Sequence, residues 1–349
     1  IQNTPFEQSR LLPCSLFCFK KLLRRFRGKD NVFIMEIYDY THKTEYFDSK
    51  ILRRYLGDMR LGVFDIETLG LYPKQNPMIL AGIMAVKEDG TCHVRQLFAE
   101  NSKPEEERLL LAELEEELSQ FDCILTFNGK RFDIPYVRER AARLGFSDYR
   151  SEPFNLDLLL FLRHYSGLRE VLGNLRQKTV ERYMGLSPDR EDEISGGESV
   201  LLYQDFENCR DEKKKAALRE KILLHNHDDL LQLYKIFPII LQTDIHAAMN
   251  KMGFPVKGIY GWPNLHIGSM KVAANTLTVQ GHYCGSEALS FCSYSTPERP
   301  YNCTFRADGS FLVELAARGM KTQLTNPLAV NELTQALLIR FMRDNPLNA

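Results

Sequence analysis

The chain has 349 residues, of which 44% are hydrophobic and 26% are charged, an ordinary composition for a soluble globular protein of about two domains. No run approaches the roughly 18 apolar residues of a membrane span, so membrane, collagen-like and disordered classes are excluded. Forty-five Lys and Arg against 46 Asp and Glu give a net charge of −1, which gives no bulk electrostatic sign of a nucleic-acid partner. The eight cysteines form no C-x-x-C pair, so we expect reduced thiols in a cytoplasmic protein.

Residues 1–58 form a basic N-terminal segment. Residues 11–19 are apolar, but positive charge follows them instead of preceding them, which is the reverse of a secretory signal. Six of the ten residues from 20 to 29 are Lys or Arg, interleaved with apolar residues. This pattern predicts an amphipathic helix, which either contacts phosphates or a membrane surface, or packs on the protein with its charged face in solvent.

A regular α/β pattern occupies residues 59–245. Three apolar runs, 61–67, 78–87 and 92–100, predict a meander of strands, and an Asp-Gly turn joins the last two. The elements predicted after them are a leucine-rich helix to about residue 121, a strand at 123–127, a helix at 134–144, a strand at 154–159 and helices from 160 to about 245. We therefore expect a mixed sheet, a meander plus parallel strands, flanked by helices.

The pattern changes again at residues 246–349. Alternating polar and apolar residues at 277–283 predict a strand, Asp308-Gly309 predicts a hairpin turn, and a last helix is expected at 331–343. We predict a small antiparallel β-rich domain with a final helix. Its aromatic residues either fill a small core or form a stacking surface for nucleic acid. The spacing of its cysteines and histidines fits no zinc motif.

Two acids interrupt the first predicted strand of the α/β region. Asp65 and Glu67 are two residues apart, so on a strand they share one face, opposite Phe64 and Ile66. Two like charges are costly to bury unless a cation compensates them, and Mg²⁺ or Mn²⁺ prefers carboxylate oxygens. The alternative is that the strand ends at Phe64 and both acids lie in a solvated loop.

A polar turn at residues 128–133 follows the strand at 123–127. It places Asn128, the basic pair Lys130 and Arg131, and an acid where a strand meets a helix. Asp133 either joins the two earlier acids or only caps the helix that follows it.

A third acidic element lies on a late helix. His225 and Asp229 are four residues apart on the same stripe as Ile222 and Leu233. An ionisable pair on an apolar face requires an ion-pair partner or a metal. The neighbouring His227 and Asp228 fall on other faces, and solvent exposure is expected for both. Acids on these three elements suit a site in which carboxylates bridge two cations about 4 Å apart.

These elements resemble a known group of enzymes. The segments Phe64-Asp65-Ile66-Glu67-Thr68 and Thr126-Phe127-Asn128-Gly129, with Phe132-Asp133 and the final Asp229, resemble the three motifs of the DEDD, DnaQ-like 3′–5′ exonucleases, which have a ribonuclease H-like fold. The segments 155–159 and His225-Asn226-x-x-Asp229-Leu230 are similar to the bacterial YprB-type family. The resemblance covers residues 60–242.

The resemblance implies a set of site residues. Asp65, Glu67 and Asp229 would ligate one Mg²⁺ or Mn²⁺ ion, and Asp65 with Asp133 would hold a second. His225 stands where the DEDDy enzymes have Tyr. Members with a catalytic histidine usually place it one residue earlier, which here is Leu224. His225 is therefore either the general base or a structural residue. Asp157 is either a supporting acid or a structural one.

The implied activity is metal-dependent hydrolysis of phosphodiester bonds from the 3′ end of single-stranded DNA or RNA by a two-metal mechanism. Asn128, Lys130, Arg131 and Phe132 would contact the substrate, and Tyr136 could stack on a base, although core packing suits Phe132 better. The alternative is a catalytically weak ribonuclease H-like module that binds nucleic acid or a protein. If the enzyme prediction is right, the four acids converge within about 4–6 Å of a common point.

Overall fold

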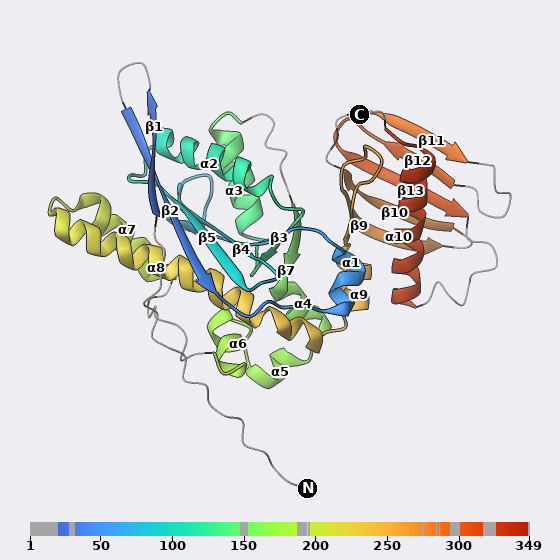
Figure 1. Cartoon of the computed structure of the whole chain (residues 1–349), viewed down its shortest axis with the longest axis horizontal. Coiled ribbons are helices and arrows are strands. Elements are labelled where there is room, and N and C mark those ends of the chain that lie inside the picture. The colour runs from blue at the N-terminus through green and yellow to red at the C-terminus, as the bar shows by residue number, and fades with distance from the viewer. Residues whose placement is uncertain are drawn as a thin grey trace, which may run out of the picture.

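The structure, a computed structural model, places two sheets side by side with helices around them (Figure 1). The described residues are 20–27, 32–146, 153–186, 194, 196–273, 276–283, 285, 287–293, 301–316 and 326–347.

The first sheet has seven strands and is mixed. In spatial order they are β1 (Lys20–Arg27), β2 (Val32–Lys43), β5 (Thr91–Phe98), β4 (Met78–Val86), β3 (Leu61–Thr68), β6 (Cys123–Thr126) and β7 (Phe154–Asp157). The strands from β1 to β3 in this order are antiparallel to their neighbours, while β3, β6 and β7 are parallel. The meander followed by parallel strands is therefore confirmed.

Helices cover both faces of this sheet. Phe64 and Ile66 pack with leucines of α2 (Pro104–Leu118) and with α3 (Asp133–Arg143). The opposite face lies under α8 (Glu212–Ile236). The other helices before the second sheet are α1 (Lys50–Leu56), α4 (Leu158–Tyr165), α5 (Leu168–Leu172), α6 (Gln177–Tyr183), α7 (Gly196–Asn208), η2 (Phe237–Gln242) and α9 (Ile245–Met252). In the part of the chain that is described, no helix combines the length and apolar character needed to cross a membrane.

The basic segment predicted as a helix is a strand. Residues 20–27 form β1, which pairs in antiparallel register with β2, and β2 pairs with β5. The prediction was wrong because the preference of a short segment is decided by the partner it finds, and the sequence pattern did not reveal β2. Residues 28 and 29 of the predicted helix lie outside the described residues.

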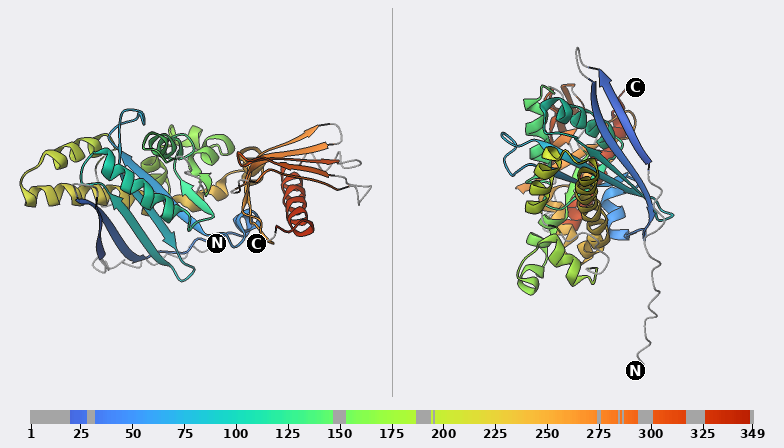
Figure 2. Two further views of the ribbon diagram at one scale, coloured as in Figure 1. Left: turned by 90° about the horizontal axis from the view of Figure 1, so that it is seen from above. Right: turned by 90° about the vertical axis from the view of Figure 1, so that its left-hand side faces the viewer.

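The second sheet has six antiparallel strands. In spatial order they are β11 (Leu289–Ser293), β12 (Tyr301–Phe305), β13 (Ser310–Ala316), β10 (Thr276–Tyr283), β9 (Leu265–Ala273) and β8 (Pro255–Val256). The Asp308-Gly309 turn joins β12 to β13, as expected, with Gly309 in the left-handed region (φ 79°). The last helix, α10 (Pro327–Asp344), lies along one face of this sheet, and no described helix covers the opposite face (Figure 2).

The aromatic residues of the second sheet form its core. Trp262, Phe305 and Phe341 pack together with ring centroids 4.9 to 5.5 Å apart. Tyr283 and Phe311 are also buried. These aromatic side chains therefore pack together in one core that includes Phe341 of α10, as the core-packing alternative predicted. Tyr294 lies outside the described residues.

Buried polar contacts join the second sheet to the first region. Asn331 of α10 donates hydrogen bonds to the Tyr55 hydroxyl (3.0 Å) and to the carbonyl of His246 (2.9 Å). Asn264, next to β9, donates to Asp122, which precedes β6 (2.8 Å). Because Asn331 is only 1% exposed, leaving its amide unpaired would be costly, so its two hydrogen bonds help to hold α10 against the first region.

Candidate functional site

Two acids of the site lie at the end of β3. The strand runs to Thr68, so the alternative in which it ends at Phe64 is wrong. Phe64 and Ile66 are buried on the face of α2 and α3, which leaves Asp65 and Glu67 on the face of α8. The pairing with β4 shifts register between Glu67 and Thr68. Such an irregularity bends a strand and changes the direction of its side chains, as is common beside active sites.

Helix α8 adds a histidine and a third acid. The His225 Nε2 atom lies 3.5 Å from Glu67 Oε1 and 3.7 Å from Asp229 Oδ2. His225 and Glu67 are buried, whereas the Asp229 side chain is 24% exposed. One ligand atom from each of these three residues lies within 4.8 Å of the other two. Among the described residues this is the one such group of three His, Cys, Asp or Glu side chains.

A fourth acid comes from the beginning of α3. The carboxylate of Asp133 accepts a hydrogen bond from the backbone N–H of Ile66, between the two acids of β3 (3.3 Å). Burial, with the charges of Asp157 and Glu67, raises the pKa of Asp133 to about 7. Asp133 is therefore tied to β3, the strand that carries Asp65 and Glu67, which a simple capping role does not require. Neither Asp133 nor Asp65 belongs to the group of three whose ligand atoms lie within 4.8 Å of one another.

The carboxyl group of Asp65 lies within the field of the other three. Its pKa is raised well above the ordinary value by burial and by the negative charges of Asp133, Asp229 and Glu67. Like charges held this closely destabilise the ionised form unless a cation compensates them. Oxygen-rich, anionic donor sets of this kind suit hard divalent cations, so the residues fit the metal that the motifs imply.

Asp157 organises the turn at 128–133. Its two carboxylate oxygens accept hydrogen bonds from the backbone N–H groups of Asn128 (2.9 Å) and Lys130 (3.0 Å). These bonds hold Asn128 in the left-handed region (φ 75°), which few residues other than glycine adopt. Burial raises the pKa of Asp157, and the hydrogen bonds from the backbone oppose that rise.

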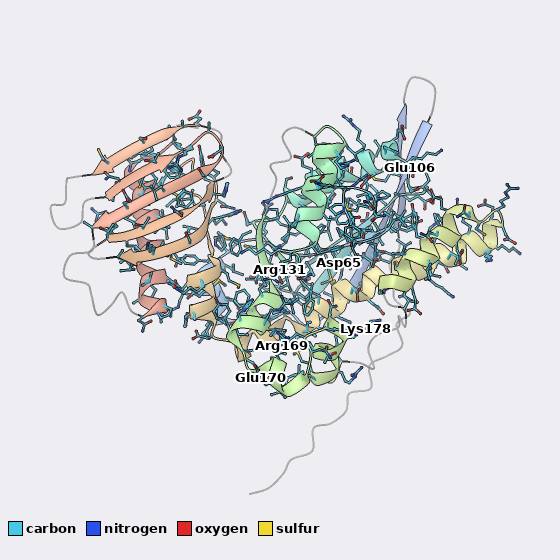
Figure 3. The ribbon with its side chains drawn as sticks, turned by 180° about the vertical axis from the view of Figure 1, so that it is seen from behind. Asp65, Glu106, Arg131, Arg169, Glu170 and Lys178 are labelled. Atoms are coloured by element: carbon cyan, nitrogen blue, oxygen red, sulfur yellow. The ribbon has the colours of Figure 1, made fainter. Side chains whose placement is uncertain are left out.

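The residues expected to contact substrate differ in their surroundings. Arg131 is exposed, and in Figure 3 it lies on the side of Asp65 nearer the six-stranded sheet. Lys130 is exposed too, and its Nζ donates to the carbonyl of Met252 (3.2 Å). Phe132 is partly buried and packs on the core between α2 and α3.

Tyr136 cannot stack on a base in this arrangement. Its side chain is 1% exposed, and the single proton of its hydroxyl is shared between the carbonyls of Gly70 (3.0 Å) and Asn76 (2.9 Å). The bonds hold the loop that follows β3. At the tip of this loop Leu71 and Tyr72 are 74% and 68% exposed. Sequence patterns missed these two residues because no periodicity marks an apolar residue on an irregular loop.

The expectation that His227 and Asp228 lie in solvent is wrong. Their side chains are 5% and 4% exposed. The Nε2 atom of His227 lies 2.8 Å from Nε2 of His42 on β2, and the Tyr40 ring packs edge-on against His227. Residues of β2 cover His227 on α8. The sequence pattern did not predict β2, so this face of the helix was expected to lie in solvent.

Comparisons with known proteins give one short sequence match and several partial structural ones. Forty-one residues, 12% of this chain and 5% of the other protein, are 54% identical to DNA polymerase 1 of Sulfolobus acidocaldarius. Exonuclease I of Methylocaldum szegediense is 14% identical with a TM-score of 0.30, over 63% of this chain and 54% of its own. E. coli exonuclease I in complex with a dT13 oligonucleotide is 14% identical with a TM-score of 0.30, over 64% and 55%. The chain thus spans about half the length of these exonuclease I chains.

The family comparison covers the region that carries the acids. A family model described as RNase H superfamily matches residues 63–240, just over half of the 349 residues. The matched range begins in β3 and ends in η2, directly after α8. The chain belongs to the RNase H superfamily.

Proposed function

We propose that this chain is a metal-dependent 3′–5′ exonuclease of the DEDD, DnaQ-like group, with motifs of the YprB type, that hydrolyses single-stranded DNA or RNA. Membership of the RNase H superfamily suggests a nuclease. The observation that carries the proposal is the mutual placement of four acids. Asp65 and Glu67 lie on β3, and Asp133 accepts a hydrogen bond from the Ile66 N–H between them. One carboxylate oxygen of Asp229 lies within 4.8 Å of one of Glu67. Four acids from three separate elements, two of them buried and two partly buried, support a cation site better than a structural role.

The acids divide between two cation positions in this proposal. Asp65, Glu67 and Asp229 would hold one Mg²⁺ or Mn²⁺, and Asp65 and Asp133 would hold the other. Two such cations, when bound, would activate the attacking water and neutralise charge on the leaving oxygen. The protein contributes a fixed set of oxygens, since β3, α3 and α8 are joined through the core.

We assign His225 the role of general base. Its Nε2 atom lies 3.5 Å from Glu67 Oε1 and 3.7 Å from Asp229 Oδ2, so the ring points into the group of acids. A histidine has an ordinary pKa close to neutral pH, which suits proton transfer from water. The proposal therefore keeps the catalytic alternative for His225 and not the purely structural one.

The polynucleotide would contact the turn at 128–133 and the loop after β3. Exposed Lys130 and Arg131 offer positive charge to phosphates, with Asn128 and Phe132 beside them. Exposed Leu71 and Tyr72 offer apolar surface to bases, and Tyr72 can stack on any base. Tyr136 would act only by holding that loop.

Degradation of labelled oligonucleotides tests the proposed activity. Single-stranded DNA and RNA with a 5′ label are incubated with the protein and Mn²⁺, alongside Asp65→Ala and Asp229→Ala. We expect progressively shorter labelled products with the native protein, no products with either variant, and resistance of a substrate whose 3′ end is blocked. Binding without metal-dependent degradation, or equal degradation by the variants, would instead favour the catalytically weak binding module.

A further inference from the structure

One row of residues crosses the first sheet beneath α8. Asp65 on β3 lies opposite Gly82 on β4, and Gly82 lies opposite Gln96 on β5. The middle position has no side chain, so it leaves space between the two polar ones. Asn226 of α8 occupies this space: a Cβ atom added to Gly82 would lie 2.1 Å from Asn226 Oδ1. Asn226 and Gln96 are both 0% exposed.

A chain of hydrogen bonds runs along this row. The Asn226 Nδ2 atom donates to Asp65 Oδ2 (2.9 Å), and Gln96 Nε2 donates to Asn226 Oδ1 (2.8 Å). Gln96 Nε2 also donates to the backbone carbonyl of Leu223 (2.9 Å). A backbone carbonyl can only accept, which fixes the orientation of the Gln96 amide and, through it, that of Asn226. The donor of Asn226 must then point at Asp65.

We propose that Asn226 and Gln96 are positioning residues that fix the rotation of the Asp65 carboxyl group, so that it presents a lone pair to a divalent cation. The inference rests on the proposed function, because it assigns Asp65 to the metal site. A carboxylate that ligates a metal needs a defined orientation, and hydrogen bonds from residues behind it supply that orientation. The cradle at Gly82 lets an amide from α8 reach Asp65 without moving β4.

The pair is poorly explained as core packing. A buried amide costs stability unless all its polar atoms are paired. Gln96 Oε1 is buried and has no hydrogen-bond partner among the residues that the structure describes. Two apolar side chains would fill the same space without that cost, but they could not donate a hydrogen bond to Asp65, as Asn226 does (2.9 Å).

Binding of Mn²⁺ to the full chain, without nucleic acid, tests the proposal. The electron paramagnetic resonance signal of free Mn²⁺ gives the Kd for the native protein, Asn226→Leu, Gln96→Leu and Gly82→Ala. We expect Asn226→Leu to raise the Kd about 10- to 100-fold, the range typical of residues behind a metal ligand. Gly82→Ala should raise it too, because its Cβ displaces Asn226 without removing any polar group.

Gln232→Leu is the matched control. Gln232 is a buried amide on the same helix, 1% exposed, and its Oε1 also lacks a hydrogen-bond partner among the described residues. We expect its Mn²⁺ Kd to stay within twofold of the native value. Circular dichroism and the Tm of each variant establish that the protein measured is folded, and Gly82→Ala and Gln96→Leu provide the comparison if Asn226→Leu does not fold.

Two results would overturn the inference in distinguishable ways. If the native protein binds Mn²⁺ and Asp65→Ala abolishes binding, but the folded row variants bind like Gln232→Leu, the metal centre stands and the positioning role is wrong. If the native protein binds no Mn²⁺, the proposed function fails and the positioning role fails with it.

Discussion

Polar side chains point toward a helix in the seven-stranded sheet and away from one in the six-stranded sheet. Glu67 and Gln96 face α8 and are 7% and 0% exposed. Gln280 and Glu314 alternate with buried Val279 and Val313, and both lie exposed on the face away from α10. The two sheets therefore use residues of similar chemistry in opposite surroundings.

Polar side chains buried under α8 need hydrogen-bond or charge partners, whereas those on the open face of the six-stranded sheet do not. A polar group on an open sheet face keeps its contact with water and costs nothing. A polar group under a helix loses that contact and is retained only with partners. In the first sheet the partners include other acids, which raise the pKa of Asp65 instead of stabilising its charge. Buried groups arranged in this way are more frequent at functional sites than elsewhere, which supports the proposed cation site.

The largest difference is expected between two glutamates on strands. Glu67→Gln should reduce Mn²⁺-dependent degradation about 10³-fold, because loss of a metal ligand costs several kcal/mol and each 1.36 kcal/mol is tenfold. Glu314→Gln, on the open face, should leave the rate unchanged. The degradation rate of a 5′-labelled oligonucleotide provides the measurement. Similar rates for both variants would show that Glu67 is not needed for the activity.

Two histidines give the next comparison. His225→Asn should lower the maximal rate about 10²-fold at saturating Mn²⁺, as loss of a general base does. Exposed His282, replaced by Asn, should have no effect. Single-turnover kinetics measure both. A His225→Asn variant with a weaker Mn²⁺ Kd and an unchanged maximal rate would make His225 a residue of the metal site and not the base.

Two aspartates that accept backbone hydrogen bonds sharpen the contrast further. Asp157→Asn replaces one carboxylate oxygen with an NH₂ group, so one of the two N–H groups of the turn at 128–133 loses its acceptor. We expect about a tenfold loss of rate, typical of an indirect contribution, and a stability loss of about 1–3 kcal/mol. Asp308→Asn changes an exposed hairpin turn and serves as the control. Urea unfolding and the degradation rate together distinguish a displaced turn from an unfolded one.

The smallest effect concerns His266, a polar residue of the second sheet that lies near the first. Burial, then the charge of His282, lowers its pKa from 6.5 to about 4, and its ring packs edge-on against Phe154 at 5.8 Å. As the pH falls below 6.5, His266 binds a proton in the unfolded chain before it does so in the folded one. The free energy of unfolding therefore decreases as the pH falls from 6.5 toward 4.

Replacement of this histidine tests the size of that loss. His266→Phe should flatten the decline in unfolding free energy between pH 6.5 and 4 by about 1–3 kcal/mol, since one pKa unit corresponds to 1.36 kcal/mol. Urea unfolding at several pH values measures it, with exposed His164→Gln as the control. If the unfolding free energies of the native protein and His266→Phe decline in parallel with pH, the pKa of His266 is not lowered by folding and this prediction is wrong.

Local patterns predicted much of the fold. Alternation placed Asp65 and Glu67 opposite Phe64 and Ile66, and the Asp308-Gly309 turn marked the hairpin between β12 and β13. These features depend on neighbours in sequence, for which side-chain periodicity and turn preferences are direct physical constraints.

Long-range pairing accounts for what the sequence missed. Strand β2 shows no clean alternation, yet it pairs with β1 and β5 and covers His227 through His42. The burial of Tyr136 depends on carbonyls about 60 residues earlier in the chain. At the candidate site, motif spacing predicted the acids, but Gln96 carries no motif and is recognised only from the strand register that sets it across from Gly82.

Strand β1 has a consequence for solubility. Among the described residues it is one of the two edge strands of the seven-stranded sheet, and five of its eight residues are Lys or Arg. An edge strand has backbone N–H and C=O groups that can pair with a strand of another molecule. Positive charge on such a strand repels the same strand of a second copy. The basic residues of β1 therefore disfavour pairing of this edge with the same edge of a second copy.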